Sequence, residues 1–533
     1  MNNADLIVAT LKAAGIDRGF GIPSGNVLPL VEAMRAGGID FDLTAHEGSA
    51  SFAADVTGRL TGAPGLCIAT LGPGATNLAT GVGSAYLDRS PMIAITCNLN
   101  TDQLGRRIQM MIDHHALFEP ITKATLAMRT DNVAEVLEQA IRISMSEPQG
   151  PVHIDLPEDV MLAPATDQVP AVPAGDPVAA RATDAMIAEA EKLMSGAKRP
   201  VAVIGSNTMR MADPSLLLAF IDHHGIPFTT TTMAKGMIDE DHPLSLGCIE
   251  RARRQVQRSL IRSADLVIGL GYDTIEVEYE AWIANVPLLQ VDIEPVDVDS
   301  SVTLAAEVTG DLDDSLTRLN ALDATSNAWG SQEAAEHKKT FQGLLRPRTE
   351  GLVPHSVIDT VRATLPANGI LAFDVGAHTH QIASQWATHE PKTFLITNGW
   401  SSMGFGLPAA IAAKAACPDR PVVCIIGDGC FQMTCGEVVT ARRMGLTIPI
   451  VVLNDEWLSL IRVKQDRRQF KNYGSGLESG TATTPEHYFG VPAYGVTDGA
   501  SLLNALGKAF AADGPTVIEA YVDPAHYQDT VFD

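Results

Sequence analysis

The stretch Val422–Lys464 decides the fold of this chain, and it reads VVCIIGDGCFQMTCGEVVTARRMGLTIPIVVLNDEWLSLIRVK. One apolar, β-branched run leads into Gly-Asp428-Gly, and a second leads into Asn454. Two such runs joined by a helical segment predict a βαβ unit with parallel strands. Asp428 and Asn454 therefore follow two strands at the same edge of one sheet, where open α/β sheets bind their ligands.

The residue types at this edge suit a magnesium ion that holds a diphosphate. Mg²⁺ prefers near-octahedral oxygen ligation and takes only a few protein oxygens, with phosphate and water completing its shell. Asp428 and Asn454 offer such oxygens. Gly427 and Gly429 leave backbone N–H groups open to close approach by a phosphate. We therefore predict a Mg-diphosphate site at this position.

Length and composition limit the classes of protein to consider. A chain of 533 residues is too long for one hydrophobic core, and roughly three domains are expected. Apolar residues make up 46% and charged residues 19%, which is typical of a globular protein in water. The formal net charge of −25 argues against a nucleic-acid partner, which would need a basic face.

The cysteines and the apolar runs predict a cytoplasmic protein. None of the seven cysteines forms a metal-binding pair such as CxxC, so we expect reduced thiols. Cys430 follows the GDG directly, and we interpret it as a small residue packed near a cofactor, because nothing nearby suggests a nucleophile. No secretory signal peptide and no membrane-spanning apolar run of about 18 residues is visible.

Alternating strand and helix patterns predict the α/β class, with three doubly wound parallel-sheet domains. We expect the domains at residues 1–165, 183–322 and 351–533, separated by linkers at Pro164–Ala179 and 323–350. The strands that we predict most clearly are Gly65–Leu71, Met92–Cys97, Val152–Leu156, Pro200–Gly205, Leu266–Gly271, Pro287–Val291, Ile370–Asp374, Phe394–Thr397 and Thr516–Val522, besides the two runs quoted above.

Glu47, in His46-Glu47-Gly48, admits two interpretations. An acid that opens a helix is favoured there by the helix dipole. The residue also follows a short strand and precedes small residues, so the ring of a ligand could pack closely against it.

Five motifs taken together carry a family resemblance. They are HEG at 46–48, GPGATN at 72–77, MGFGLPAA at 403–410, GDGC at 427–430 and the later Asn454. Together they resemble the acetohydroxyacid synthase/pyruvate oxidase family of thiamine diphosphate (ThDP) enzymes, and the resemblance covers essentially the whole chain. It implies ThDP and Mg²⁺ as cofactors, and the domain order pyrimidine-binding, central, diphosphate-binding.

The resemblance also assigns roles to individual residues. On the pyrimidine side, it implies Glu47 as the acid that activates the cofactor, and the loop near the pyrimidine as Gly72, Pro73, Gly74 and Asn77. On the diphosphate side, it places Met403 beneath the V-shaped cofactor, and beside the diphosphate it places Gly376, His378, Gly427, Gly429 and Cys430. The ligands of Mg²⁺ that it implies are Asp428, Asn454 and the carbonyl of Glu456. For His378 and Met403, a purely structural role stays open. The resemblance further implies a homodimer or homotetramer with active sites at the subunit interface.

Within this family, three segments resemble the FAD-free catabolic acetolactate synthases. They are Gly271–Trp282, Ala116–Lys123 and Tyr521–Asp529. The segment Val203–Asn207 has one glycine where flavin-binding relatives have a glycine-rich turn. We therefore expect no functional FAD.

Two segments depart from the family pattern, and both concern the substrate. The family places a glutamine near the reacting centre, but that register falls on Met110 here, with Gln109 beside it. His114 and His115 are similar to paired histidines of related decarboxylases, in a shifted register. Beyond Asn454, the segment Trp457–Gln465 differs from the catabolic synthases; Arg462 and Lys464 in it either reach an anionic substrate or form a solvated helix face.

We therefore predict a decarboxylase of a 2-oxo acid, with pyruvate favoured, that joins the remaining acyl unit to a second carbonyl compound, as acetolactate synthase does. One alternative is a decarboxylase, carboligase or acyltransferase for an aromatic, sulfonated or other anionic substrate. Another is a non-catalytic paralogue, against which the intact Glu47, Asp428 and Asn454 argue.

Overall fold

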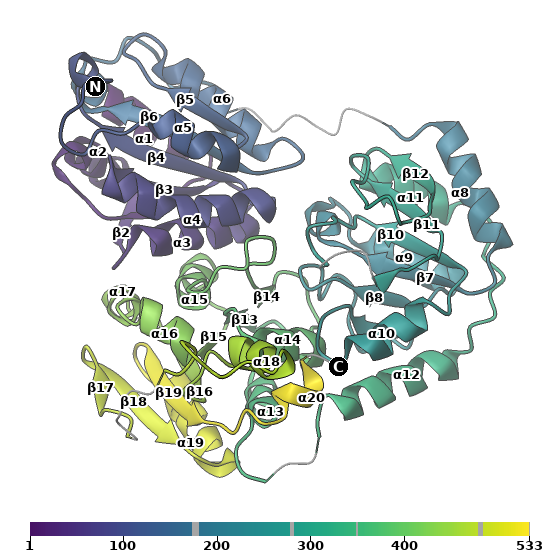
Figure 1. Cartoon of the computed structure of the whole chain (residues 1–533). Helices are drawn as coiled ribbons and strands as arrows, with labels where there is room; N and C mark the ends of the chain where they lie inside the picture. Colours follow the sequence, from purple (N-terminus) through teal and green to yellow (C-terminus); the bar gives the residue numbers. More distant parts are fainter. Residues whose placement is uncertain (173–180, 278–281, 348–349, 478–482, 532–533) are drawn as a thin grey trace.

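The computed structural model describes residues 1–172, 181–277, 282–347, 350–477 and 483–531. It contains three sheets dominated by parallel strands, each covered by helices (Figure 1), which confirms the predicted α/β class. The central strands are buried along their whole length, as parallel strands with helices on both faces must be. Parts of the predicted first and second linkers, and residues 278–281 of the segment ending at Trp282, lie outside the described residues.

The first sheet has the strand order β2-β1-β3-β4-β6-β5, and all its strands are parallel. Its strands are β1 (Arg18–Gly21), β2 (Asp40–Leu43), β3 (Gly65–Thr70), β4 (Met92–Asn98), β5 (Ala124–Ala127) and β6 (Pro151–Pro157). Its helices are α1 (Asn3–Ala13), α2 (Leu28–Gly37), α3 (Glu47–Thr61), α4 (Pro73–Leu87), α5 (His114–Phe118), α6 (Val133–Met145) and α7 (Glu158–Leu162).

The second sheet has the order β12-β11-β10-β7-β8-β9, again all parallel. Its strands are β7 (Pro200–Ile204), β8 (Phe228–Thr230), β9 (Ser245–Cys248), β10 (Leu266–Leu270), β11 (Leu288–Asp292) and β12 (Leu304–Thr309). Its helices are α8 (Asp184–Gly196), α9 (Ser215–His224), α10 (Arg254–Ile261) and α11 (Leu312–Asn320). The predicted second linker contains α12 (Ser331–Leu344), whose Phe341 is fully buried near Ala252.

The third sheet has the order β14-β13-β15-β16-β19-β18-β17, in which only β17 runs antiparallel among the described strands. Its strands are β13 (Ile370–Phe373), β14 (Phe394–Leu395), β15 (Val422–Gly427), β16 (Pro449–Asn454), β17 (His487–Tyr488), β18 (Val491–Val496) and β19 (Thr516–Tyr521). Its helices are α13 (Pro354–Thr364), α14 (Ala377–Gln385), α15 (Gly406–Ala416), α16 (Asp428–Thr434), α17 (Glu437–Arg443), α18 (Ser459–Arg467), α19 (Gly499–Phe510) and α20 (Tyr527–Thr530).

The first and third sheets share one architecture. When the strands of the third sheet are ranked along the chain without β17, their spatial order is the same as that of β1 to β6. Gly72 therefore follows the third strand of one sheet, and Gly427 ends the third strand of the other. The sequence does not reveal this likeness by residue identity, because strand order depends on long-range pairing.

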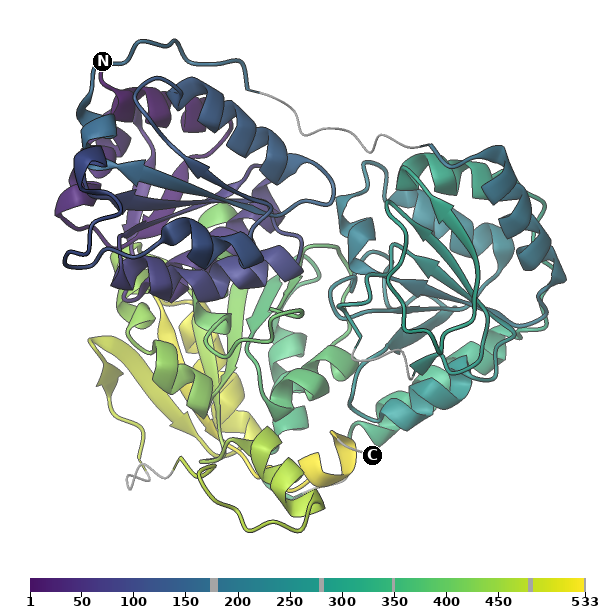
Figure 2. The ribbon, with the colours of Figure 1, turned by 45° about the horizontal axis from the view of Figure 1, so that its top comes forward.

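The first sheet and its helices lie directly on the third, and the second stands beside both (Figure 2). Helices α3 and α4 contribute to the same hydrophobic core as α15. The rings of Phe52 and Phe405 meet edge to face, with their centroids 5.6 Å apart. Arg59 reaches across this contact and donates to the Ile396 carbonyl at 2.7 Å, while Asp55 and Asp88 neutralise it.

Replacing Phe405 with alanine is expected to lower the free energy of unfolding by about 3–5 kcal/mol, because the ring fills a core shared by two domains. Urea denaturation followed by circular dichroism measures the change. The control is Leu503→Ala on α19, since that side chain is exposed and its loss should cost under about 0.5 kcal/mol. Equal effects of the two substitutions would contradict the assignment of Phe405 to the shared core.

Candidate active site

The carboxyl ends of β15 and β16 bring Asp428 and Asn454 together. Gly427 and Leu453 are register partners in the two strands, so the residues after them are neighbours. Asp428 Oδ1 accepts from the Gly429 amide at 2.8 Å, and its Oδ2 accepts from the Glu456 amide at 2.7 Å. Burial raises the pKa of the Asp428 carboxyl to about 6. A cation beside it would offset the cost of holding this charge out of water.

Asn454 Oδ1 is buried and has no hydrogen-bond partner. A buried oxygen without a partner costs free energy unless a ligand satisfies it. Glu456 adopts a left-handed backbone conformation with φ of +60°, and its carbonyl accepts one bond from the Leu477 amide, which leaves a second lone pair. These oxygens fit the set that Mg²⁺ prefers.

A cavity of about 230 Å³ opens at this edge, beside the neighbouring strands β13 and β15, between which the strand order changes direction. Of the residues predicted from the sequence, it is lined by Gly376, His378, Met403, Gly427, Asp428, Gly429, Cys430 and Trp457. Sequence reasoning missed Asp455 and Tyr527, which also line it. Burial and the nearby Asp428 raise the pKa of Asp455 to about 7. In the sequence, the position of Asp455 next to Asn454 is the one sign that it could border the site.

His378 forms part of the floor of this cavity. A β-carbon at Gly376 or at Gly427 would lie 2.7 or 2.9 Å from His378 Cε1, so only glycines fit against the ring. Burial lowers the pKa of His378 to about 4, so the imidazole is neutral near pH 7, and its buried Nε2 has no partner. A diphosphate oxygen would meet bare backbone and a neutral ring here.

Cys430 and Met403 lie on either side of the GDG turn. The Cys430 thiol donates to the Val375 carbonyl at 3.1 Å, and burial raises its pKa well above the usual range, so it is an inert packing group. The Met403 methyl group is 3.5 Å from the place that a β-carbon of Gly429 would take. A thioether at that distance would support a ligand bound over Gly429 through packing contacts alone.

Glu47 is the first residue of α3 and is only 8% exposed. Its Oε2 accepts from the side-chain amide of Asn77 at 3.0 Å, and its Oε1 lies 3.4 Å from the β-carbon position of Gly74. Gly72 has φ of +63°, which favours glycine, and Pro73 opens α4 at a position that needs no N–H donor. The predicted pyrimidine-side residues therefore form one cluster.

Glu47 does not line the cavity at Asp428. The lining residues in the described part of the chain all fall between Val375 and Tyr527. Within one chain, the turn before Glu47 contacts α17 of the third domain, where Glu437 accepts from the Ala45 and His46 amides at 3.0 and 3.2 Å. The two clusters of predicted residues are thus separate in a single chain.

Of the four predicted substrate residues of the first domain, Met110 and His114 lie against Gly72. The Met110 carbonyl would be 2.6 Å from a β-carbon at Gly72, and both Gln109 and Met110 are exposed. His114 is buried; its Nδ1 lies 2.9 Å from Thr96 Oγ1, and its Nε2 accepts from the Gly72 amide at 3.4 Å. Both nitrogens of His114 therefore have protein partners, whereas His115 is partly exposed and lies 2.8 Å from Thr125 Oγ1.

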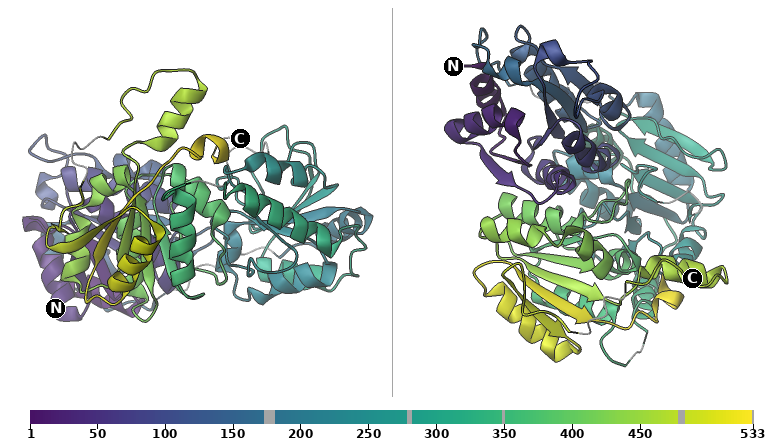
Figure 3. Two further views of the ribbon diagram at one scale, coloured as in Figure 1. Left: turned by 90° about the horizontal axis from the view of Figure 1, so that it is seen from below. Right: turned by 60° about the vertical axis from the view of Figure 1, so that its left-hand side comes forward.

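The predicted substrate residues of the third domain lie on or before α18. This helix and the loop after it stand away from the body of the domain (Figure 3, left). The Arg462 guanidinium lies 4.4 Å from the centre of the Trp457 ring, a cation–π contact that keeps it near the cavity mouth. Lys464 lies two residues beyond Arg462 on the same helix and is partly exposed.

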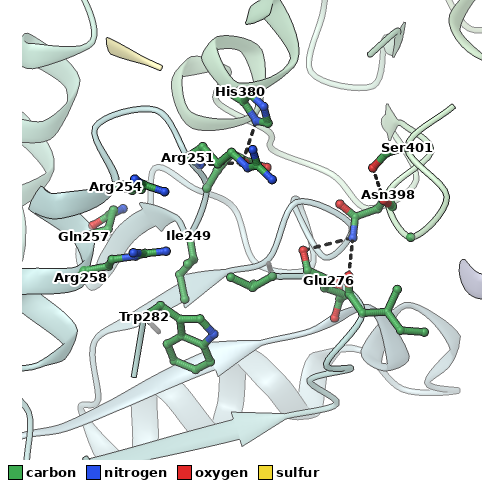
Figure 4. A pocket seen from close by; sticks show the side chains of 14 residues that line it. Ile249, Arg251, Arg254, Gln257, Arg258, Glu276, Trp282, His380, Asn398 and Ser401 are labelled. Carbon is green, nitrogen blue, oxygen red and sulfur yellow. Dashed lines mark hydrogen bonds and ion pairs between the residues drawn. The ribbon is translucent and has the colours of Figure 1, made fainter. Parts of the chain in front are cut away.

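A second cavity, of about 380 Å³, lies between the second and third domains (Figure 4). Arg251, Arg254 and Arg258 line one side of it, and Trp282 lines another. Ser401 borders both this cavity and the one at Asp428. Among the residues that line it, none was singled out from the sequence as a site residue.

Comparison with known proteins agrees with this geometry. Residues 1–117 match the N-terminal TPP binding domain of thiamine pyrophosphate enzymes, 187–319 the central domain and 374–520 the C-terminal TPP binding domain. The chain is 31% identical to the acetolactate synthase isozyme 1 large subunit of Escherichia coli (strain K12), over 98% of this chain and 94% of that one. It is 30% identical to the probable acetolactate synthase large subunit of Methanococcus aeolicus, over 98% and 92%.

The three matching domains and their order define a thiamine diphosphate-dependent enzyme. Within that class, the full-length similarity shows that the chain belongs to the acetohydroxyacid synthase-like family. None of the helices in the described ranges is long and apolar enough to cross a membrane.

The buried His153 should make the stability of the first domain depend on pH. Burial lowers its pKa to about 3, so folding keeps it neutral while the unfolded chain takes up a proton below about pH 6.5. The stabilising contribution is full above pH 6.5 and is lost as the pH falls toward 3. Between pH 6 and 5, wild type should lose about 1.2 kcal/mol more unfolding free energy than His153→Gln, as measured by urea denaturation. His487→Gln, at an exposed histidine, is the control; parallel curves for wild type and His153→Gln would contradict the expectation.

Proposed function

We propose that this enzyme decarboxylates a 2-oxo acid, with pyruvate as the favoured donor, and joins the remaining acyl unit to a second carbonyl compound. The acetolactate synthase names of its full-length relatives support this reaction. The observation that carries it is the unpartnered Asn454 oxygen beside Asp428, at a cavity floored by His378 and two glycines. That arrangement suits a diphosphate bound through Mg²⁺.

In this proposal Asp428, Asn454 and the Glu456 carbonyl hold Mg²⁺. The glycines around His378 receive the diphosphate, and Met403 supports the cofactor from below. Bound ThDP supplies an electron sink for the loss of CO₂. The protein contributes the low-dielectric surroundings, which strengthen every charge interaction at the site.

Glu47 is proposed as the acid that exchanges a proton with the pyrimidine ring. Its burial and the single bond from Asn77 leave Oε1 available to a ligand. Gly74 lets a flat ring approach this oxygen, because a side chain there would meet Glu47 itself. A short, buried contact between carboxyl and ring nitrogen is the geometry that such proton transfer needs.

A complete site then requires two chains, as a homodimer or homotetramer. The separation of Glu47 from the cavity of its own chain supports this assembly. So do the apolar side chains exposed near both clusters, which are Met110 and Ile112 on the first domain and Met433, Phe470 and Tyr473 on the third. Exposed apolar groups of this size usually mark a contact surface.

The central domain is proposed to act without FAD. The carboxyl ends of β7 and β10 form the place where a doubly wound sheet binds a dinucleotide. A β-carbon at Gly205 would lie 2.3 Å from the Gly271 carbonyl, so the two turns touch. Glu276 accepts from the Ser206 amide at 2.8 Å, and burial raises the pKa of its carboxyl to about 8. In this proposal Glu276 takes the Ser206 amide that a phosphate would otherwise use.

A carboligase for another anionic donor is the second candidate. The stacked Trp457 and Arg462 at the cavity mouth favour it, because a guanidinium held there can bind a carboxylate, sulfonate or phosphate of the donor. Incubation with ThDP, Mg²⁺ and a panel of 2-oxo acids separates the two candidates. Acetolactate from pyruvate supports the first, turnover confined to another donor supports the second, and no CO₂ from any donor contradicts both. Omitting Mg²⁺ should stop turnover.

Glu47→Gln is expected to lower the turnover number by at least about 100-fold, because an amide cannot exchange the proton. ThDP affinity should change by less than about tenfold, since the site keeps its shape. Steady-state kinetics and fluorescence titration with ThDP measure the two quantities. Glu135→Gln, at an exposed acid on α6, serves as the matched control. Turnover unchanged in Glu47→Gln would refute the role.

A further inference from the structure

The turn that leads into Glu47 is held by a helix of the third domain. On α17, Glu437, Thr440 and Arg443 are spaced three residues apart and so lie near one another on the helix surface. Glu437 Oε1 accepts from the Ala45 and His46 amides at 3.0 and 3.2 Å. Arg443 donates to the Leu43 carbonyl, and Thr440 Oγ1 lies 3.4 Å from the same carbonyl oxygen.

Glu437 is the most restrained of these three side chains. It is 1% exposed, and its second oxygen accepts from the Thr440 hydroxyl at 2.7 Å. A carboxylate that is fully removed from water must be satisfied by hydrogen bonds, and here two of its three are backbone N–H groups from another domain. Neither amide can move without leaving part of this charge unpaired.

The bonds of the Ala45 and His46 amides to Glu437 restrain Glu47, which is the next residue in the chain. The Nδ1 of His46 accepts from the Gly48 amide at 3.0 Å and caps α3, so Glu47 stands between two residues whose positions are fixed. The strand β2 ends at Leu43, and no regular element contains residues 44–46. The place of the Glu47 carboxyl therefore depends on the bonds from α17 as well as on α3, of which it is the first residue.

We propose that Glu437 is a positioning residue that sets where the Glu47 carboxyl meets the cofactor ring. This proposal rests on the proposed function of Glu47. The side chain acts through the Ala45 and His46 amides and touches neither substrate nor cofactor. In this proposal the segment 428–437 serves two active sites. Asp428, at its start, belongs to the cavity of its own chain, and Glu437, at its end, supports a Glu47 that acts in the site shared with another chain.

Three substitutions separate hydrogen bonding from charge. Glu437→Gln removes the charge but keeps an oxygen at the same distance from both amides. Glu437→Asp keeps the charge but withdraws it by one methylene group, and Glu437→Ala removes both. Arg442→Ala is the control on the same helix, because Arg442 bonds to the Phe489 carbonyl and not to the turn.

The first measurement uses the apoenzyme, in which amide hydrogen exchange of residues 43–48 is followed by mass spectrometry. We expect about tenfold faster exchange in the Asp and Ala variants, and no change in the Gln variant or the control. The second measures exchange of the C2 proton of bound ThDP with solvent. It should slow by about 10- to 100-fold in the Asp and Ala variants, because small misplacements of a catalytic group are costly. ThDP affinity should stay within about threefold of wild type.

The outcomes that would overturn the proposal are distinct. Wild-type C2 proton exchange in Glu437→Asp would show that the turn needs no such anchor. A loss in Glu437→Gln equal to that in Glu437→Asp would contradict positioning through the two hydrogen bonds, because glutamine keeps an oxygen at their distance. An equal loss in Arg442→Ala would assign the effect to helix packing. Should Glu437→Ala not fold, Glu437→Asp carries the test. Glu47→Gln is measured beside these variants. Unchanged C2 proton exchange in Glu47→Gln refutes the proposed function itself. Slower C2 proton exchange in Glu47→Gln, with no effect of Glu437→Asp, refutes only the positioning role.

Discussion

The packing of α3 against α15 is the constraint on which the rest of this structure depends. It joins two domains of the same architecture through a shared core, with Phe52 and Phe405 at its centre. Arg59 lies inside this contact, and two buried carboxylates compensate its charge. Breaking the contact would expose apolar surface and also leave these charges unpaired, so the relative orientation of the two domains is strongly held.

This fixed orientation decides what each chain can do. The Glu47 cluster does not border the cavity at Asp428, although both clusters lie at the carboxyl edges of equivalent sheets. In the proposed function, one chain therefore holds two incomplete halves of the site. A second copy that brings the halves together would also cover the apolar side chains around them.

The cavity at Asp428 is arranged for a ligand before any ligand binds. Asp428 and Asp455 have raised pKa values, the pKa of His378 is lowered, and the Asn454 oxygen lacks a partner. Each of these states costs free energy in the isolated chain. Such costs are found where a ligand or metal is expected to compensate them, and they cluster here.

Local patterns in the sequence determined the strands, their order of appearance and the residues at their carboxyl ends. The buried apolar runs before Asp428 and Asn454 predict two parallel strands, which the structure contains. The GDG turn lies at the end of the first of these strands. Short or half-exposed strands such as β2 and β18 are weaker signals, because few or only half of their side chains are buried. The helix α12 falls within the predicted linker at 323–350, because its mostly polar sequence gives little sign of the few residues that pack.

Only the tertiary structure decided which of these residues meet. Glu47 and Asp428 occur in one sequence, yet the packing of α3 on α15 keeps them apart, and no local pattern encodes that distance. Likewise, Glu437 reads as an ordinary acid at the start of a helix, and its bonds to Ala45 and His46 exist only because two distant segments fold together. The sequence determined the chemistry of the groups, and long-range packing determined their geometry, because contacts between domains depend on surfaces that no single segment contains.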